Sequence, residues 1–262
     1  MEMERYEDGV PSWVDLGSPD LAAAKAFYSG LFGWDTPDGP PEAGGYCVCL
    51  LNGRTVAGLG PKMNPEGPTV WTTYVNVRDA DEVARKVTAN GGQVFMAPFD
   101  VLEAGRMGIF ADPAGAVFGV WQPNGHLGAG VVNEPGSLVW NELVTTDVAG
   151  AMAFYGAVFG WGAQAQGPLG ADGVGAYTEW KVSDRSVGGL MAKPETMPAE
   201  VPPHWMTYFA VADTDKAVAK VEELGGTVMM GATDIEPGRF AVVADPTGGF
   251  FGVITMKEGP AT

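Results

Sequence analysis

Two carboxylates stand at matching places in the chain, each two residues after a tryptophan: Asp15 after Trp13, and Glu142 after Trp140. Residues i and i+2 of an extended strand share one face, so each carboxylate is expected beside an indole ring. Partial removal from water raises the pKa of a carboxyl and suits it to general acid or base catalysis. Asp15 and Glu142 are therefore our candidate catalytic residues. The alternative is a structural carboxylate whose oxygens accept hydrogen bonds from the backbone or from arginine.

Other reactive side chains are few. The chain has two histidines, His126 and His204, which disfavours any mechanism that needs several imidazoles. Its two cysteines, Cys47 and Cys49, share one face of a predicted strand, where we expect reduced thiols in the core. No glycine-rich phosphate loop opens a helix, and no nucleophile elbow is found. Nucleotide binding of the Walker or dinucleotide type and serine-hydrolase chemistry are therefore disfavoured.

These residues belong to an internal repeat. The run from Trp13 to Trp34 contains an aspartate, a Phe-Tyr pair and a Phe-Gly-Trp ending, and the same pattern returns between Trp140 and Trp161. Further on, Gly-Arg followed by Asp-Pro-x-Gly occurs at 105–115 and again at 238–248. Self-similarity over such a length indicates duplicated domains. We predict two domains, residues 1–125 and 126–262, joined through a stretch at 122–136 that carries glycine and proline.

Within each half the apolar pattern changes between strand and helix. Residues 12–17 alternate as a strand does, and Ser18-Pro19 offers an N-cap and a first-turn proline for a helix that Gly33 ends. In the first half a second helix is expected at 79–90, and further strands at 46–52, 54–60, 70–77, 93–97, 106–111 and 116–121. Each half then holds two β-α-β-β-β units, which predicts an α+β protein built from four such units.

A strand, then Asp-Leu-x-x-Ala-x-x-Phe-Tyr, then Leu-Phe-Gly-Trp and later Asp-Pro-x-Gly, is an order of elements that resembles the vicinal-oxygen-chelate superfamily. That superfamily includes glyoxalase I, extradiol dioxygenases and the bleomycin- and fosfomycin-resistance proteins. The tandem form is similar to actinobacterial glyoxalase-like proteins, among them a mycobacterial antigen and proteins of aromatic-polyketide pathways labelled hydroxylases. The resemblance implies four modules that form two cupped mixed sheets with helices outside, and one cup in each half.

Metal-dependent members of that superfamily place histidine or glutamate at four positions in each cup. His204 is the one conceivable ligand near these positions in this chain, and a single imidazole is not a metal site. We therefore expect no metal ion and no cofactor. At the matching positions the chain carries side chains that do not bind metals: Trp13, Thr72, Gly119 and a residue within 55–60 in the first half, and Trp140, Met206, Gly252 and a residue within 186–191 in the second.

The faces that lack metal ligands carry aromatic and other apolar side chains instead. Rings and a thioether suit an aromatic or otherwise hydrophobic small molecule, although the same residues could simply fill the cups as core. Arg106 and Arg239 are candidates to anchor an anionic group of the ligand, or to hold a loop through ion pairs with Asp100 and Asp234. Strand alternation gives the other candidate ligand contacts: Trp13, Thr72, Tyr74, Asn76, Trp121, Trp140, His204, Met206 and Tyr208.

The charge balance restricts the partners. The chain has 15 lysines and arginines against 32 aspartates and glutamates, a formal net charge of −17. Such a surface repels phosphate backbones and anionic lipid headgroups, so we expect no nucleic acid and no membrane as partner. The acidic start of the chain and the lack of a long apolar run predict a cytoplasmic location. The expected partner is a small molecule, bound by a monomer or a homodimer.

Three functions remain open on these residues. The first is a metal-independent protein that binds a hydrophobic or aromatic natural product, either to sequester it or to tailor it with Asp15 or Glu142 as a proton-transfer group. The second is a lyase similar to glyoxalase I that detoxifies 2-oxoaldehydes such as methylglyoxal, and the third is a non-catalytic interaction protein. If the protein is an enzyme, the resemblance implies a lyase, an isomerase or an accessory to an oxygenase.

Overall fold

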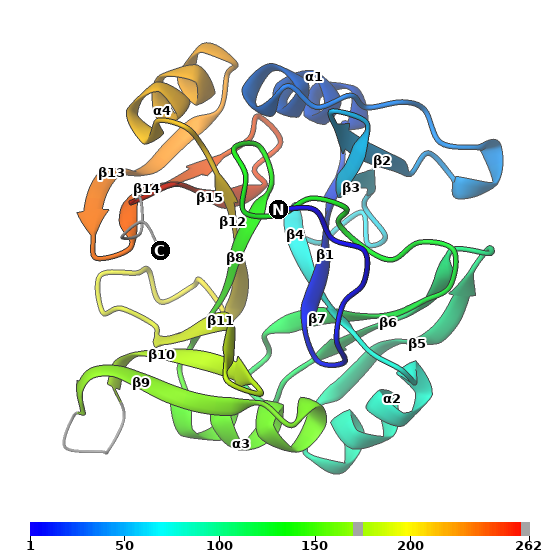
Figure 1. The fold of residues 1–262 in the computed structure, drawn as a ribbon, viewed down its shortest axis with the longest axis vertical. Coiled ribbons are helices and arrows are strands. Elements are labelled where there is room, and N and C mark those ends of the chain that lie inside the picture. The colour runs from blue at the N-terminus through cyan, green and yellow to red at the C-terminus, as the bar shows by residue number, and fades with distance from the viewer. Residues whose placement is uncertain (170–174, 258–262) are drawn as a thin grey trace.

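The computed structural model describes residues 1–169 and 175–257, which form two mixed β-sheets and four α-helices (Figure 1). The first half contains β1 (Pro11–Ser18), α1 (Leu21–Phe32), a short 3-10 turn (Pro41–Ala43), β2 (Cys47–Leu51), β3 (Arg54–Pro61), β4 (Val70–Asn76), α2 (Ala80–Ala89), β5 (Gln93–Val101), β6 (Gly105–Ala111) and β7 (Val117–Pro123). The second half contains β8 (Leu138–Thr145), α3 (Val148–Phe159), β9 (Gly162–Leu169), β10 (Gly175–Val182), β11 (Arg185–Ala192), β12 (His204–Ala210), α4 (Thr214–Glu223), β13 (Thr227–Ile235), β14 (Gly238–Ala244) and β15 (Phe250–Met256).

Each half forms one sheet in which its two modules lie side by side. The strand order is β2-β3-β1-β4-β7-β6-β5 in the first half and β13-β14-β15-β12-β8-β11-β10-β9 in the second. The central strands are antiparallel, β1 with β4 and β8 with β12, and each has a parallel neighbour on its other side. The predicted α+β fold with two mixed sheets is confirmed.

The first module has one strand fewer than predicted. Between α1 and β2 the chain passes three prolines and the 3-10 turn, and an isolated bridge from Asp35 to Leu50 stands where the second half has β9. Proline has no N–H to donate to a strand ladder, so this segment cannot pair along its length. The other three modules have the predicted β-α-β-β-β order.

The prediction of Ser18 as the N-cap of α1 is wrong. Asp20 caps this helix, since its carboxylate accepts a hydrogen bond from the Ala23 N–H at 3.0 Å, and the Ser18 hydroxyl accepts one from the Asp20 N–H. A carboxylate at this position also interacts favourably with the positive end of the helix dipole, which a serine hydroxyl does more weakly. Gly33 ends the helix as predicted, in the left-handed region at φ 72°.

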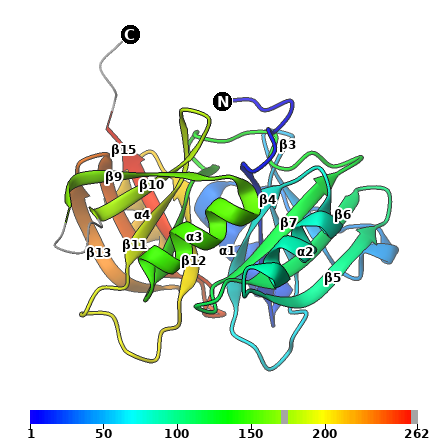
Figure 2. The same cartoon turned by 90° about the horizontal axis from the view of Figure 1, so that it is seen from below.

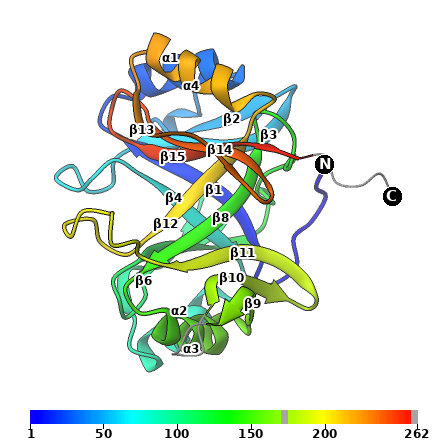
Figure 3. The same ribbon diagram turned by 90° about the vertical axis from the view of Figure 1, so that its left-hand side faces the viewer.

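The two halves share their hydrophobic cores. Helix α1 lies beside α4 and α2 lies beside α3 (Figures 2 and 3). One core cluster brings Tyr28 of α1 against Phe251 of the second half, with ring centroids 5.6 Å apart. The other brings Phe118 of the first half against Tyr155 of α3, also at 5.6 Å. Neither half therefore buries its own helices alone.

Reciprocal hydrogen bonds join the halves through the repeated motifs. The hydroxyl of Tyr28, from the Phe-Tyr motif of the first half, donates to Oδ2 of Asp245 at 2.8 Å. The hydroxyl of Tyr155 donates to Oδ2 of Asp112 at 3.2 Å in the opposite direction. Both aspartates begin an Asp-Pro-x-Gly turn and are buried. These motifs therefore fasten one half to the other.

Candidate functional site

The face of each sheet opposite its helices carries the residues that strand alternation predicts. We call these faces the N-terminal cup, in the sheet of β1, and the C-terminal cup, in the sheet of β8. In the N-terminal cup Asp15 lies opposite Thr72, and Trp13 lies opposite Tyr74. Because cross-strand partners point to the same face, the predicted set does meet on one surface. The second half repeats this register with Glu142 opposite Met206 and Trp140 opposite Tyr208.

Asp15 of β1 is held by two tyrosines in the N-terminal cup. The hydroxyls of Tyr46 and Tyr74 both donate to its Oδ2 atom, at 3.2 and 3.1 Å. The indole N–H of Trp13 donates to the Tyr46 hydroxyl at 2.9 Å. These hydrogen bonds connect four side chains into one network, in the order Trp13, Tyr46, Asp15 and Tyr74.

Glu142 of β8 has the same surroundings in the C-terminal cup. The Tyr208 hydroxyl donates to its Oε1 atom at 3.1 Å, and the Tyr177 hydroxyl is its second donor. The indole N–H of Trp140 donates to the Tyr177 hydroxyl at 2.8 Å. The network is therefore duplicated with the fold, and only the length of the carboxylate side chain differs between the copies.

Burial makes both carboxyls weak acids. It raises the pKa of Asp15 from 3.8 to about 7, although the hydrogen bonds from Tyr74 and Tyr46 act in the opposite direction. Burial also raises the pKa of Glu142 above its ordinary value, again against its two tyrosine donors. The pKa values of Tyr46 and Tyr74 are raised well above their ordinary value by burial, and next by the carboxyl of Asp15. The phenols thus stay protonated, while the Asp15 carboxyl can gain or lose a proton near neutral pH.

Glycines make room for the tyrosine side chains. A Cβ atom at Gly119 would overlap the ring of Tyr74, and a Cβ atom at Gly252 would overlap the ring of Tyr208. Gly58 likewise leaves space for the hydroxyl of Tyr46. Gly119 and Gly252 stand where the family resemblance implies metal ligands. The residues present therefore do not fit a metal ion of that type, because tyrosine rings fill the space that ligand side chains would need.

The described residues form no cluster of metal ligands in these cups. No group of three or more histidine, cysteine, aspartate or glutamate side chains in residues 1–169 and 175–257 is placed to hold an ion. His204 packs edge-on against Phe250 with ring centroids 5.2 Å apart, and its Nδ1 atom lies 2.9 Å from the carbonyl oxygen of Pro202. The one histidine that shares a face with the candidate ligand positions thus has local partners.

Most predicted ligand contacts are packed rather than open. Asn76 is buried and donates to the backbone carbonyls of Tyr6 and Glu7, at 3.2 and 3.0 Å, so it ties the N-terminal segment to β4. Partial exposure remains at Asp15, Thr72, Trp140 and His204, whereas the following residues are buried: Trp13, Tyr74, Trp121, Met206 and Tyr208.

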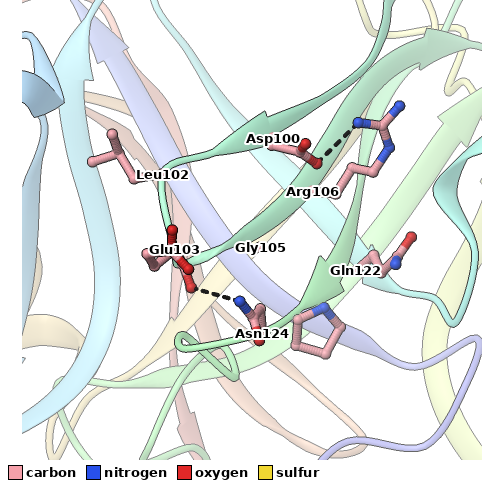
Figure 4. Close-up of a pocket in the computed structure, with 8 residues that line it drawn as sticks. Asp100, Leu102, Glu103, Gly105, Arg106, Gln122 and Asn124 are labelled. Atoms are coloured by element: carbon pink, nitrogen blue, oxygen red, sulfur yellow. Dashed lines mark hydrogen bonds and ion pairs between the residues drawn. The ribbon is translucent and has the colours of Figure 1, made fainter.

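The two arginines lie apart from the carboxylate networks. Arg106 makes two hydrogen bonds to Asp81 of α2, at 2.9 and 3.0 Å, and one to Asp100 at 2.9 Å (Figure 4). The predicted ion pair with Asp100 is thus present, on the side of the sheet that α2 covers. Arg239 repeats the arrangement with Asp215 and Asp234.

Two surface hollows lie near Arg106 and its partner Asp81, outside the cups. One of about 350 Å³ is formed by the end of the β5–β6 hairpin and by β7, and it includes Arg106 and Asn124 (Figure 4). The other, of about 620 Å³, lies between α2 and β5. Neither hollow is lined by a residue of the two networks.

Sequence reasoning missed Tyr46 and Tyr177, the second tyrosine of each network. Tyr46 immediately precedes β2, the strand that pairs with β3, and Tyr177 lies near the start of β10, the strand that pairs with β11. A signal was present, because each tyrosine recurs at the same place in the repeat and faces a glycine, Gly58 or Gly189.

Comparison with known proteins agrees with this architecture. The model of the Glyoxalase/Bleomycin resistance protein/Dioxygenase superfamily matches residues 11–120 and 137–251. A protein of Mycobacterium bovis named "Putative glyoxylase CFP32" is 46% identical over 261 residues, 97% of this chain and 97% of that protein. The "Anthracycline biosynthesis protein DnrV" of Streptomyces peucetius is 41% identical over 272 residues, 98% of this chain and 97% of that protein.

Solved structures share the fold at low identity. The 2,3-dioxygenase LapB from Pseudomonas sp. KL28 matches with a TM-score of 0.66 at 15% identity, over 98% of this chain and 96% of that chain. The Mn(II)-bound glyoxalase from Novosphingobium aromaticivorans matches with a TM-score of 0.65 at 17% identity, over 96% and 84%. No helix in the described part of this chain is long and apolar enough to cross a membrane. With both halves matched, the chain belongs to the Glyoxalase/Bleomycin resistance protein/Dioxygenase superfamily, as a tandem member.

Proposed function

We propose that the protein binds a planar aromatic small molecule at its cups without a metal ion, and that Asp15 or Glu142 exchanges a proton with this ligand. The observation that carries the proposal is the duplicated network in which two phenols hold a buried carboxyl of raised pKa. Such a carboxyl can donate a hydrogen bond to a carbonyl when protonated and accept one from a phenol when ionised.

Asp15 has an oxygen atom to spare for a ligand. Both tyrosines donate to Oδ2, and no hydrogen bond to Oδ1 is found among the described residues. The side chain also keeps partial exposure. Oδ1 can therefore take part in a further hydrogen bond while the tyrosines keep the carboxyl in place.

The surroundings of each carboxyl are apolar enough to hold a flat ring. In the C-terminal cup, Phe240, Val242 and Phe250 are half-buried and pack against the buried cluster of this cup. In the N-terminal cup, Met107 and Ile109 of β6 are half-buried on the same face. Aromatic and thioether side chains with part of their surface open give a ligand apolar contact area beside one polar group.

The relatives support the choice of ligand class. Streptomyces proteins named for anthracycline biosynthesis are 41% identical to this chain over nearly its whole length, and anthracyclines are hydroxylated polycyclic aromatics. The relative with "glyoxylase" in its name favours a lyase instead. Lyase chemistry of that kind uses a metal ion to polarise the substrate oxygens, and here glycines stand at two of the matching ligand positions, Gly119 and Gly252, with tyrosine rings filling the space beside them. We therefore propose binding and proton exchange rather than metal-assisted lysis.

Calorimetric titration of the full chain with a hydroxylated anthraquinone, in buffer containing a chelator, tests the proposal. We expect saturable binding that weakens at least about tenfold when the carboxyl that meets the ligand is replaced, in either Glu142→Gln or Asp15→Asn, a loss of about 1.4 kcal/mol. Thr36→Ala, outside both cups, is the matched control and should bind as wild type. Turnover of the methylglyoxal–thiol adduct that depends on an added divalent metal would instead establish the lyase. No binding with chelator present, in wild type and control alike, would refute the proposed function.

A further inference from the structure

One tryptophan differs from all the others in exposure. Seven of the eight are at most 6% exposed, whereas Trp140, on the face of the C-terminal cup, is half-buried. Its equivalent in the N-terminal cup, Trp13, is only 3% exposed. The two residues have the same hydrogen bond to a network tyrosine, so the network does not cause the difference.

The cover over Trp13 comes from the connection between the halves. The ring of His126 stands perpendicular to the indole of Trp13 with centroids 4.5 Å apart, and it makes a similar edge contact with Trp121 at 5.7 Å. The indole N–H of Trp121 donates to the backbone carbonyl of His126 at 2.7 Å. The imidazole ring thus packs edge-to-face against two tryptophans, an arrangement that aromatic pairs prefer.

Hydrogen bonds to two backbone carbonyls fix this connection in place. The Ala129 N–H donates to the carbonyl of Ser12 at 2.8 Å, and the Thr55 hydroxyl donates to the carbonyl of Gly128 at 2.9 Å. Gly128 has φ 110° and packs so tightly on Ser12 that no larger residue would fit. The segment therefore joins β1 and β3 and holds His126 in the cup.

The His126 ring behaves as an uncharged aromatic group. Burial lowers its pKa to about 4, so the imidazole is neutral at physiological pH. Its Nε2 atom is buried and has no hydrogen-bond partner among the described residues. The ring thus packs by its shape and π-system rather than through a polar contact at Nε2.

We infer that His126 occupies the N-terminal cup as a built-in aromatic occupant, and that the C-terminal cup is the one that takes the external aromatic ligand, with one ligand bound per chain. This inference rests on the proposed function and adds which cup performs it. In the C-terminal cup Trp140, His204 and Phe250 keep open surface on the face that carries Glu142, whose own side chain is buried beneath them. The ligand class that fits is an uncharged flat ring system that packs on these rings and presents a hydroxyl or carbonyl to Glu142.

Acrylamide quenching of tryptophan fluorescence tests the cover without any ligand. The fraction of tryptophan fluorescence that is readily quenched in wild type should be lost in Trp140→Phe and unchanged in Trp13→Phe. His126→Gly should increase the readily quenched fraction, because Trp13 and Trp121 both lose the ring packed against them, while His126→Phe, which keeps a ring in the cup, should resemble wild type. Equal quenching losses in Trp13→Phe and Trp140→Phe would overturn the inference. Near-wild-type circular dichroism shows that each variant is folded.

Stoichiometry with the anthraquinone probe tests which cup binds. We expect one ligand per chain in wild type, at least a tenfold loss of affinity in Trp140→Ala, no change in Trp13→Phe, and two ligands per chain in His126→Gly. Two ligands in wild type, or loss of binding in Trp13→Phe alone, would refute the assignment to the C-terminal cup and leave the proposed function standing. Absence of binding in every variant would refute the proposed function, while quenching would still decide whether His126 covers Trp13.

Discussion

Replacement of Asp15 by asparagine removes one ionisable group and keeps its shape and hydrogen-bond acceptor. Burial raises the pKa of this carboxyl from 3.8 to about 7 in the folded protein. In the unfolded chain the carboxyl returns to its ordinary value, so the folded state retains a proton over a pH range in which the unfolded chain has lost it. Within that range unfolding releases a proton, and the free energy of unfolding falls as pH rises.

The size of the effect follows from the two pKa values. At about 1.4 kcal/mol for each pH unit, the stabilisation from the retained proton amounts to up to about 4 kcal/mol. It is fully present below pH 3.8 and is lost as pH rises through about 7. Asp15→Asn lacks this dependence. The free energy of unfolding of wild type minus that of the variant should therefore fall by up to about 4 kcal/mol between about pH 4 and pH 8.

Urea unfolding followed by far-ultraviolet circular dichroism measures this difference at each pH. The matched control is Asp38→Asn, because Asp38 is exposed and its hydrogen bond to Lys25 lowers the pKa of its carboxyl. The difference in free energy of unfolding between wild type and Asp38→Asn should be constant above about pH 5, where Asp38 is ionised in both the folded and the unfolded chain. A difference for Asp15→Asn that is constant or grows with pH would show that the carboxyl is ionised in the folded protein, and the argument from burial would be wrong.

Two further predictions concern the packing. Gly252→Ala places a methyl group against the ring of Tyr208 and should lower the free energy of unfolding by about 1–3 kcal/mol. The control Gly231→Ala, which has open space around it, should change the free energy of unfolding by less than about 0.5 kcal/mol. Equal changes in the two variants would show that Gly252 does not make room for the ring. Tyr28→Phe leaves the Oδ2 atom of the buried Asp245 side chain without its tyrosine donor and should cost about 1–3 kcal/mol in urea unfolding, and no loss would contradict the interlock between the halves.

Much of the cup geometry could be predicted from local pattern. The period of two residues places Trp13 and Asp15 on one face, and the repeat then places Trp140 and Glu142 in the same way. Motif spacing placed Tyr74 on the same cup face as Trp13, and the structure adds that the two residues lie opposite each other. These inferences needed only the direction of side chains along a strand and the order of strands implied by the resemblance.

The features that sequence reasoning missed depend on contacts between distant segments. Tyr46 enters the network because β2 pairs with β3 beside β1, and a strand's own pattern does not reveal that register. The shared cores are a second case, because the partner of Tyr28 is Asp245 in the other half. Helix periodicity predicts which face is buried but does not show which half covers it.

Comparison of the two cups separates what the fold requires from what differs between them. Both cups hold a carboxylate between two tyrosines and use glycine to admit a tyrosine ring, so this network is a property of the duplicated unit. A property present twice cannot by itself decide where a ligand binds. The cover does differ, because the chain that leaves β7 carries His126 onto Trp13, whereas Trp140 remains open. The network then supplies a carboxyl that can exchange a proton, and access to the cup decides which carboxyl meets a ligand.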